Sequence, residues 1–223
     1  MSLLSEHPNW YYLVREIYNA YRFSSAGGSA LIRNHQKEVR HRVARCLEKD
    51  PAFAALQPET KPVCAHLAAA LDAGRDENTR VLIQAVERIY STLSWRFGYD
   101  KVPRGLERKY AFAEIMGPRG PVVGTEVILG LVLFAPRCVY PVHSHQGITE
   151  SYLCLAGACS ENETGVYAPG SWILNRPGHE HRITTGDHRP CLLLYAWVSE
   201  PEVLDGQKMV FSRPAASKKK PPG

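Results

Sequence analysis

The spacing of glycine and proline after Pro103 constrains the fold of this chain more than any other feature of its sequence. These residues interrupt the chain about every eight to twelve positions, and the runs between them are short, apolar and rich in β-branched residues. This texture predicts an all-β sandwich or barrel. The expected strands are 110–116, 126–134, 139–145, 150–156, 158–161, 165–167, 171–174, 181–184 and 191–198.

The first hundred residues have a helical periodicity instead. Between Trp10 and Tyr21 the apolar residues recur at three- and four-residue spacing, which gives one apolar face. The fourth expected helix would begin at Asn78 or Thr79 and would end at Gly98. Helices are therefore expected over 10–21, 30–48, 63–71 and 78–98.

These patterns divide the chain into three parts. Residues 1–102 are expected to form a helical segment that packs on the second part, a β-barrel over 103–213. Residues 214–223 contain three consecutive lysines followed by two prolines, and we expect a basic, disordered tail there.

Composition narrows the class of protein. Hydrophobic residues make up 44% of the 223 residues and charged residues 22%, which is typical of a soluble globular protein. The net charge of +5 comes partly from the tail, and no stripe of Lys and Arg interleaved with aromatic residues appears elsewhere, so we expect no nucleic-acid partner. The sequence shows no signal peptide and no run of about 20 apolar residues, so we expect no membrane association and a cytoplasmic location. The six cysteines form no C-x-x-C pair, which favours reduced, mostly buried thiols.

A group of histidines and one glutamate in the expected barrel are the candidate metal ligands. His143 and His145 are two residues apart, so in a strand both side chains point to the same face. Glu150 follows a turn-like segment and can face the same lumen, while His179 and His181 offer further imidazoles on a separate strand. Nitrogen ligands with one carboxylate suit a first-row divalent metal ion and leave positions open for water and substrate. We expect one such ion, and the ligands do not distinguish Zn²⁺, Fe²⁺, Mn²⁺, Ni²⁺ and Co²⁺.

An isolated H-x-H is a weak signal, but here it is part of a longer motif. The segment from His143 to Gly157 resembles the first motif of the cupin superfamily. It consists of His143-Ser-His145, a gap of four residues, Glu150, a gap of six residues, and Gly157. Gly170, Gly178 and His181 resemble the second motif, although Pro177 stands directly before Gly178 and the usual Asn after the histidine is missing. The resemblance implies a mainly β protein, a small cupin barrel (a double-stranded β-helix or jelly roll) preceded by the helical segment. It also implies His181 as the fourth ligand, with His179 as the alternative.

A closer resemblance covers roughly residues 110–200. Six stretches of the sequence resemble the bacterial cupin-type dimethylsulfoniopropionate (DMSP) lyases, namely 128–136, 140–143, 150–157, 168–172, 181–187 and 192–197. The chain length favours the DddL-like branch of these lyases over the shorter DddQ-like branch. The resemblance implies a metal-dependent β-elimination that converts DMSP to acrylate and dimethyl sulfide. The metal ion would act as a Lewis acid on the substrate carboxylate.

Two tyrosines are candidates for catalysis. Tyr152 lies two residues after Glu150, so strand parity brings it to the same face, and the resemblance implies that it is the base. The alternative role for Tyr152 is that of a barrel-lining aromatic residue. Tyr140 matches a second family tyrosine, but its offset of three from His143 places it on the opposite face unless Pro141 marks a bulge.

Three further aromatic residues could surround the sulfonium group by cation–π attraction, although core packing is expected for at least one of them. They are Trp172, Tyr195 and Trp197.

Two other functions fit the ligand set. One is a different metal-dependent cupin enzyme, such as a dioxygenase or isomerase that acts on a small acid, and the other is a non-catalytic cupin that binds a small molecule. Tyr152 at the correct parity favours an enzyme, and barrels of this kind often pair, so we expect a homodimer with a small-molecule substrate.

Overall fold

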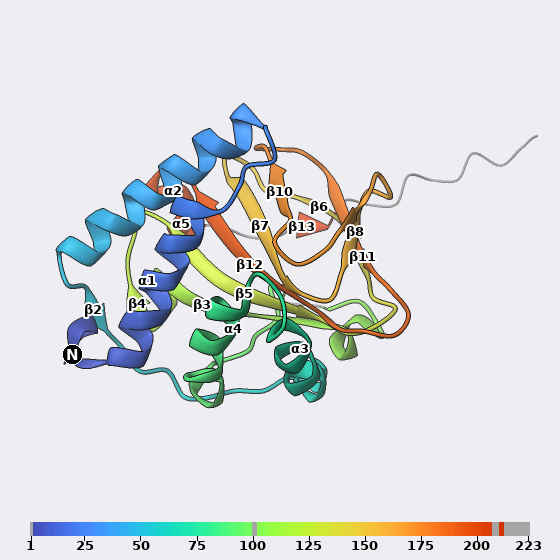
Figure 1. The fold of residues 1–223 in the computed structure, drawn as a ribbon, viewed down its shortest axis with the longest axis horizontal. Helices are drawn as coiled ribbons and strands as arrows, with labels where there is room; N and C mark the ends of the chain where they lie inside the picture. Colours follow the sequence, from blue (N-terminus) through green and yellow to red (C-terminus); the bar gives the residue numbers. More distant parts are fainter. Residues whose placement is uncertain (1, 100–101, 207–209, 212–223) are drawn as a thin grey trace, which may run out of the picture.

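The computed structural model describes residues 2–99, 102–206 and 210–211, and its strands form two sheets that enclose an apolar core (Figure 1). The eight-stranded sheet has the order β1-β2-β4-β3-β5-β12-β7-β10, and the five-stranded sheet has the order β13-β6-β11-β8-β9. The strands of the first sheet are β1 (Ser2–Leu3), β2 (Ala52–Phe53), β4 (Val122–Val123), β3 (Tyr110–Gly117), β5 (Ile128–Phe134), β12 (Cys191–Val198), β7 (Thr149–Ala156) and β10 (Trp172–Asn175). Those of the second are β13 (Val210–Phe211), β6 (Val139–Ser144), β11 (His181–Thr185), β8 (Cys159–Glu161) and β9 (Val166–Tyr167).

All nine strands expected from the sequence are present, with ends that differ by no more than two residues. The two-residue strands β1, β2, β4 and β13 were not expected. The tail predicted for residues 214–223 lies outside the described residues.

The helices are α1 (Pro8–Phe23), α2 (Ala30–Glu48), α3 (Leu67–Gly74), α4 (Arg80–Glu87) and α5 (Pro201–Gly206). The first two confirm the prediction, and the Ser29 hydroxyl caps α2 by accepting a hydrogen bond from the amide of Ile32. The third begins with a 3-10 turn, Pro62–His66, before the α-helical part. The short helix α5 was not expected.

The prediction of a long fourth helix was wrong. Helix α4 ends at Glu87, and Trp95 lies in an extended segment, where its amide donates to the carbonyl of Glu59. Trp95 is buried in this extended conformation, so its apolar character reflected burial and not helical periodicity. Thr79 stands at the N-terminus of α4, but its hydroxyl donates to the carbonyl of Leu155 on β7 instead of capping the helix.

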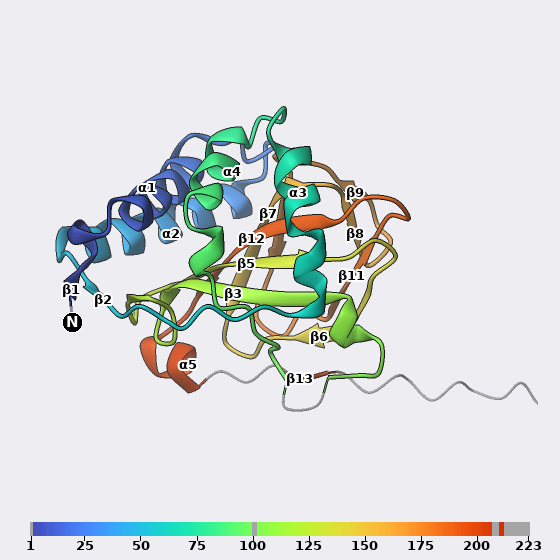
Figure 2. The ribbon, with the colours of Figure 1, turned by 90° about the horizontal axis from the view of Figure 1, so that it is seen from below.

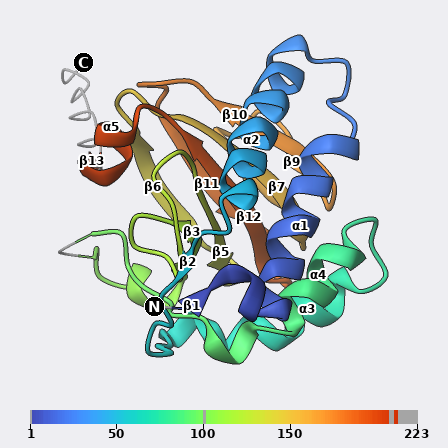
Figure 3. The same ribbon diagram turned by 90° about the vertical axis from the view of Figure 1, so that its left-hand side faces the viewer.

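The helices α1 to α4 cover one face of the eight-stranded sheet, and α1 and α2 run side by side across it (Figures 2 and 3). One buried apolar cluster contains residues of these helices together with the outward-facing residues of β7 and β12. Within this interface the Ser151 hydroxyl lies 2.8 Å from the Tyr21 hydroxyl and 2.9 Å from His35 Nε2. Burial lowers the pKa of His35 to about 4, so the imidazole is neutral at physiological pH.

Two further findings concern the cysteines and the lengths of the helices. Each of the six cysteines is free; five are buried and Cys64 is partly exposed. Among the residues described, the helices are all too short or too polar to cross a membrane.

The turn between β7 and β8 explains the glycine of the first cupin motif. Gly157 has a φ of +72°, and a Cβ placed on it would lie 2.0 Å from the carbonyl oxygen of Pro190. Only glycine fits this combination of a left-handed backbone and a close backbone approach.

Gly157→Ala should therefore lower the free energy of unfolding by about 3 kcal/mol, because the methyl group strains the turn and displaces the chain at Pro190. Urea denaturation would measure the change. Gly165→Ala is the matched control, because a Cβ placed on Gly165 would meet no atom within 4 Å beyond its chain neighbours. Equal unfolding midpoints for the two variants would contradict this explanation.

Candidate metal centre

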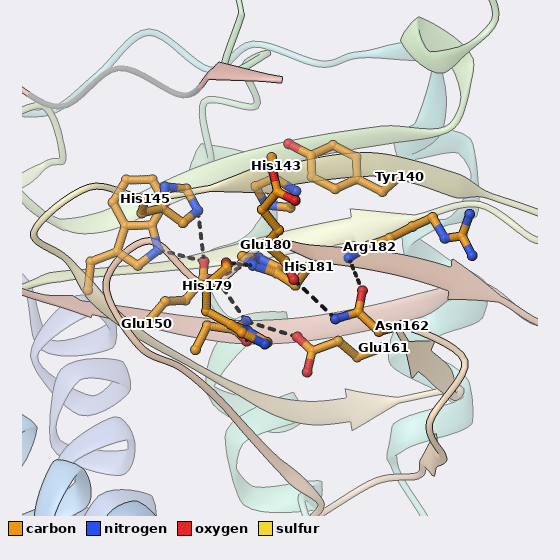
Figure 4. Close-up of polar contacts among 12 residues, drawn as sticks. Tyr140, His143, His145, Glu150, Glu161, Asn162, His179, Glu180, His181 and Arg182 are labelled. Carbon is orange, nitrogen blue, oxygen red and sulfur yellow. Dashed lines mark hydrogen bonds and ion pairs between the residues drawn. The ribbon is translucent and has the colours of Figure 1, made fainter. Parts of the chain in front are cut away.

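Four side chains from three strand regions converge inside the barrel (Figure 4). His143 lies on β6, His145 directly follows that strand, Glu150 is on β7 and His181 begins β11. One potential ligand atom from each lies within 4.8 Å of the others, and all four residues are 0–4% exposed. The register explains part of this convergence, because His143 and His181 are paired residues on neighbouring antiparallel strands and their rings are 4.0 Å apart.

The histidines are oriented as metal ligands are. His143 Nδ1 lies 2.9 Å from the carbonyl of Pro141, and His181 Nδ1 lies 3.1 Å from the carbonyl of His179. A carbonyl only accepts, so both Nδ1 atoms carry a proton, and in the neutral form of each ring the lone pair of Nε2 is available to a cation in the site. Within the described part of the chain, Nε2 of His143, His145 and His181 has no hydrogen-bond partner.

The electrostatics of the site also favour a cation. Burial lowers the pKa of His143 to about 3 and lowers that of His145, which keeps both imidazoles neutral. Burial alone would raise the pKa of Glu150, but the three surrounding histidines outweigh burial and hold the pKa of this carboxyl below its usual value. Burial would lower the pKa of His181, but Glu150 raises it, and His181 Nε2 lies 3.0 Å from Glu150 Oε2 without the alignment of a hydrogen bond. A divalent cation among these atoms would supply the positive charge that a protonated His181 otherwise provides.

Two neighbouring strands hold the Glu150 carboxylate. The indole Nε1 of Trp197 donates to Glu150 Oε1 at 2.6 Å, and the amide of Asn175 donates to Glu150 Oε2 at 3.3 Å. Both residues pair directly with Glu150 in the sheet, one on β12 and one on β10. The ring of Trp197 also lies 4.5 Å from that of His145, so Trp197 contacts two of the candidate ligands.

The structure places both candidate tyrosines beside the ligands. Tyr152 faces the lumen 6.4 Å from the ring of His181, and its pKa is well above 10 because of burial and the adjacent Glu150 carboxylate. Between Tyr140 and His143 the register of β6 against β11 shifts by one residue, so of the two outcomes that the sequence left open, a bulge near Pro141 is the one present. The bulge turns Tyr140 to the lumen, where its ring lies 4.8 Å from that of His143.

The three residues expected around the sulfonium group do not share one face. Tyr195 and Trp197 face the lumen with their rings 5.5 Å apart, and Tyr195 pairs with Tyr152 across the two strands. Trp172 lies on the opposite, helix-covered face of β10, with its ring 4.8 Å from that of Tyr21. This position argues against the expected substrate contact of Trp172, because neighbouring residues of a strand point to opposite faces and Ile173 occupies the lumen.

Several residues near the site were missed by sequence reasoning. Glu161 is 7% exposed and accepts a hydrogen bond of 2.9 Å from the Asn175 amide that also contacts Glu150. Asn162 binds the backbone on both sides of His181, since its amide donates to the carbonyl of Glu180 and its carbonyl accepts from the amide of Arg182. The signal for Asn175 was a buried polar residue at the end of an otherwise apolar strand, whereas the three residues of β8 carry no comparable signal for Glu161.

A third tyrosine, Tyr99, was also not expected near the site. It comes from the segment before the barrel, and its hydroxyl lies 2.8 Å from that of Tyr140.

Comparison with known proteins gives a consistent result. The dimethylsulfoniopropionate lyase family model matches residues 35–193. The putative dimethylsulfoniopropionate lyase DddL of Cereibacter sphaeroides is 52% identical over 211 residues, which cover 95% of this chain and 91% of that protein. Among solved structures, the DMSP lyase DddQ from Ruegeria pomeroyi DSS-3 superposes with a TM-score of 0.67 at 19% identity, covering 92% of this chain and 96% of that one. A chain from the crystal structures of the DMSP lyases RdDddP and RnDddQII gives a TM-score of 0.71 at 18% identity, covering 93% and 99%.

The fold and the site together define a cupin with N-terminal helices and a buried cluster that could hold a metal ion, so the predicted fold class is confirmed. The chain belongs to the dimethylsulfoniopropionate lyase family. It is therefore a carbon–sulfur lyase, and the resemblance to the DddL-like branch is confirmed by the relative from Cereibacter sphaeroides.

The choice between His181 and His179 as fourth ligand can be tested directly. His179 is exposed and its Nδ1 lies 3.2 Å from Asn175 Oδ1, whereas His181 is fully buried among the other ligands. His181→Ala should weaken zinc binding by more than about a hundredfold, while His179→Ala, the matched control, should change it by less than about tenfold. Zinc titration against a competing chelator would measure both affinities. A larger loss in His179→Ala would identify His179 as the ligand instead.

Proposed function

We propose that this chain cleaves DMSP to acrylate and dimethyl sulfide by β-elimination, with one divalent transition metal ion held by His143, His145, Glu150 and His181. The observation that carries the proposal is that a lumen-facing tyrosine, Tyr152, lies beside four convergent ligand residues in a chain of the DMSP lyase family. Bound there, the ion would supply a Lewis acid for the substrate carboxylate and a positive charge that lowers the pKa of a nearby phenol.

Tyr152 is the proposed base. In the reaction its phenolate oxygen takes a proton from the carbon next to the substrate carboxylate, and the electron pair of that C–H bond forms the new double bond. The C–S bond breaks at the same time, and its electron pair leaves with the sulfur as neutral dimethyl sulfide. The buried position of Tyr152 excludes water from the proton transfer and fixes the ring opposite Tyr195.

Tyr140 is the proposed second catalytic tyrosine. Its hydroxyl pairs with that of Tyr99 beside His143, so it can donate a hydrogen bond to a substrate oxygen at the metal side of the site. Tyr195 and Trp197 supply the aromatic faces for the sulfonium group, because they are the two predicted aromatic residues that face the lumen.

Removal of the Tyr152 hydroxyl tests this proposal. Tyr152→Phe should lower the release of dimethyl sulfide from DMSP by about a hundredfold or more, because the base is lost while the ring remains. Headspace gas chromatography of the purified, metal-loaded protein would measure the product, and a chelator should abolish it. The exposed Tyr90 provides the control variant Tyr90→Phe, which should keep full activity.

Zinc content must be equal in the two variants for this comparison. An undiminished release of dimethyl sulfide from Tyr152→Phe would remove Tyr152 from the role of base. Oxygen uptake during turnover would contradict the elimination itself, since an elimination consumes no oxygen.

A further inference from the structure

A second carboxylate, that of Glu161, points into the barrel without belonging to the ligand cluster (Figure 4). Glu161 lies two residues after Cys159 on β8, and the side chain of Cys159 lies in the lumen core. Glu161 also pairs across the strands with Ile183, which faces the same core. Strand parity therefore directs the Glu161 side chain inward. The residue as a whole is 7% exposed.

This carboxylate is only partly satisfied by the protein. Asn175 donates one hydrogen bond to Glu161 Oε1. Within residues 2–99, 102–206 and 210–211, no hydrogen bond reaches Oε2, and no lysine or arginine forms an ion pair with the group. The titratable groups that face it are Glu150, His179 and His181. Glu161 Oε2 is not among the described side-chain atoms that are both fully buried and without a partner, so a ligand or water can reach it. A largely buried carboxylate without a strong cationic partner is stabilised when a positively charged ligand joins it.

The distance between the two carboxylates is limited by one shared donor. Asn175 Nδ2 lies 3.3 Å from Glu150 Oε2 and 2.9 Å from Glu161 Oε1. The distance between these two carboxylate oxygens is therefore at most the sum of the two hydrogen-bond lengths. A short zwitterion, with an anionic group and a cationic group separated by two methylene carbons, has a similar length. Its carboxylate could lie at the ligand cluster while its positive group lies near Glu161.

We propose that Glu161 binds the positively charged end of the substrate and thereby selects zwitterionic sulfonium or ammonium carboxylates over uncharged ones. The proposal rests on the proposed function, since it takes the substrate carboxylate to be held at the ligand cluster. The aromatic faces of Tyr195 and Trp197 contribute polarisable surface, whereas Glu161 contributes the full opposite charge.

Two unreactive analogues test the charge preference. One replaces the dimethylsulfonium group of the substrate by trimethylammonium, and the other, its neutral isostere, has a quaternary carbon in place of that nitrogen. Isothermal titration calorimetry of the zinc-loaded protein should show the ammonium analogue binding about tenfold or more tightly than the isostere, as expected for a charge-assisted contact. In Glu161→Gln this preference should disappear, while the affinity for the isostere and the zinc content stay unchanged.

Glu163→Gln is the matched control, because Glu163 lies in the same hairpin but is exposed and paired with Arg182. It should keep the preference for the ammonium analogue. A preference that survives in Glu161→Gln, an equal loss of both analogues in that variant, or the lack of any preference in the unmodified protein would overturn the proposal. Headspace analysis of DMSP turnover is a separate measurement, so a failure of the proposed reaction is distinguishable from a failure of charge selection.

Discussion

The buried carboxylate of Glu150 sets the constraint that the rest of the barrel satisfies. The residue is 1% exposed, three imidazoles surround it, and their Nε2 atoms have no hydrogen-bond partner in the described part of the chain. A negative charge in such a place is stable only with positive charge at contact distance and with donors on its remaining oxygen lone pairs. Trp197 and Asn175 supply the donors from the two strands that pair with Glu150, and a divalent cation would supply the charge.

The helices contribute to the same arrangement from behind the sheet. Ser151 follows Glu150 on β7 and points to the opposite face, where Tyr21 of α1 and His35 of α2 contact its hydroxyl. A carboxylate in the lumen and a hydroxyl in the helix interface therefore fix the same stretch of strand from both sides. This contact is a physical reason for the barrel to carry a helical segment that shares its core. The expected homodimer and the expected cytoplasmic location stay predictions.

The fold was largely predictable because its elements follow simple periodicities. Every strand of normal length was expected, since alternation and turn residues specify strands locally, and the spacing of His143, His145 and Glu150 indicated the cluster for the same reason. Prediction failed where the outcome depended on the face of a strand or on pairing between distant segments. Trp172 is one residue away from the lumen face, and Glu161 reaches the site only through the register of β8 against β11.

Three thiols share the lumen core with the histidine cluster, and distinguishing the two as zinc ligands is a direct test of the central claim. The thiols of Cys154, Cys159 and Cys191 lie in the same lumen core, and the first two, together with burial, raise the pKa of Cys191. X-ray absorption spectroscopy of the protein loaded with one equivalent of zinc would separate the two groups. We expect only nitrogen and oxygen neighbours at about 2.0–2.2 Å, with the scattering pattern of imidazole rings. A sulfur shell at about 2.3 Å, or zinc without imidazole neighbours, would contradict a cation held by the histidines and Glu150.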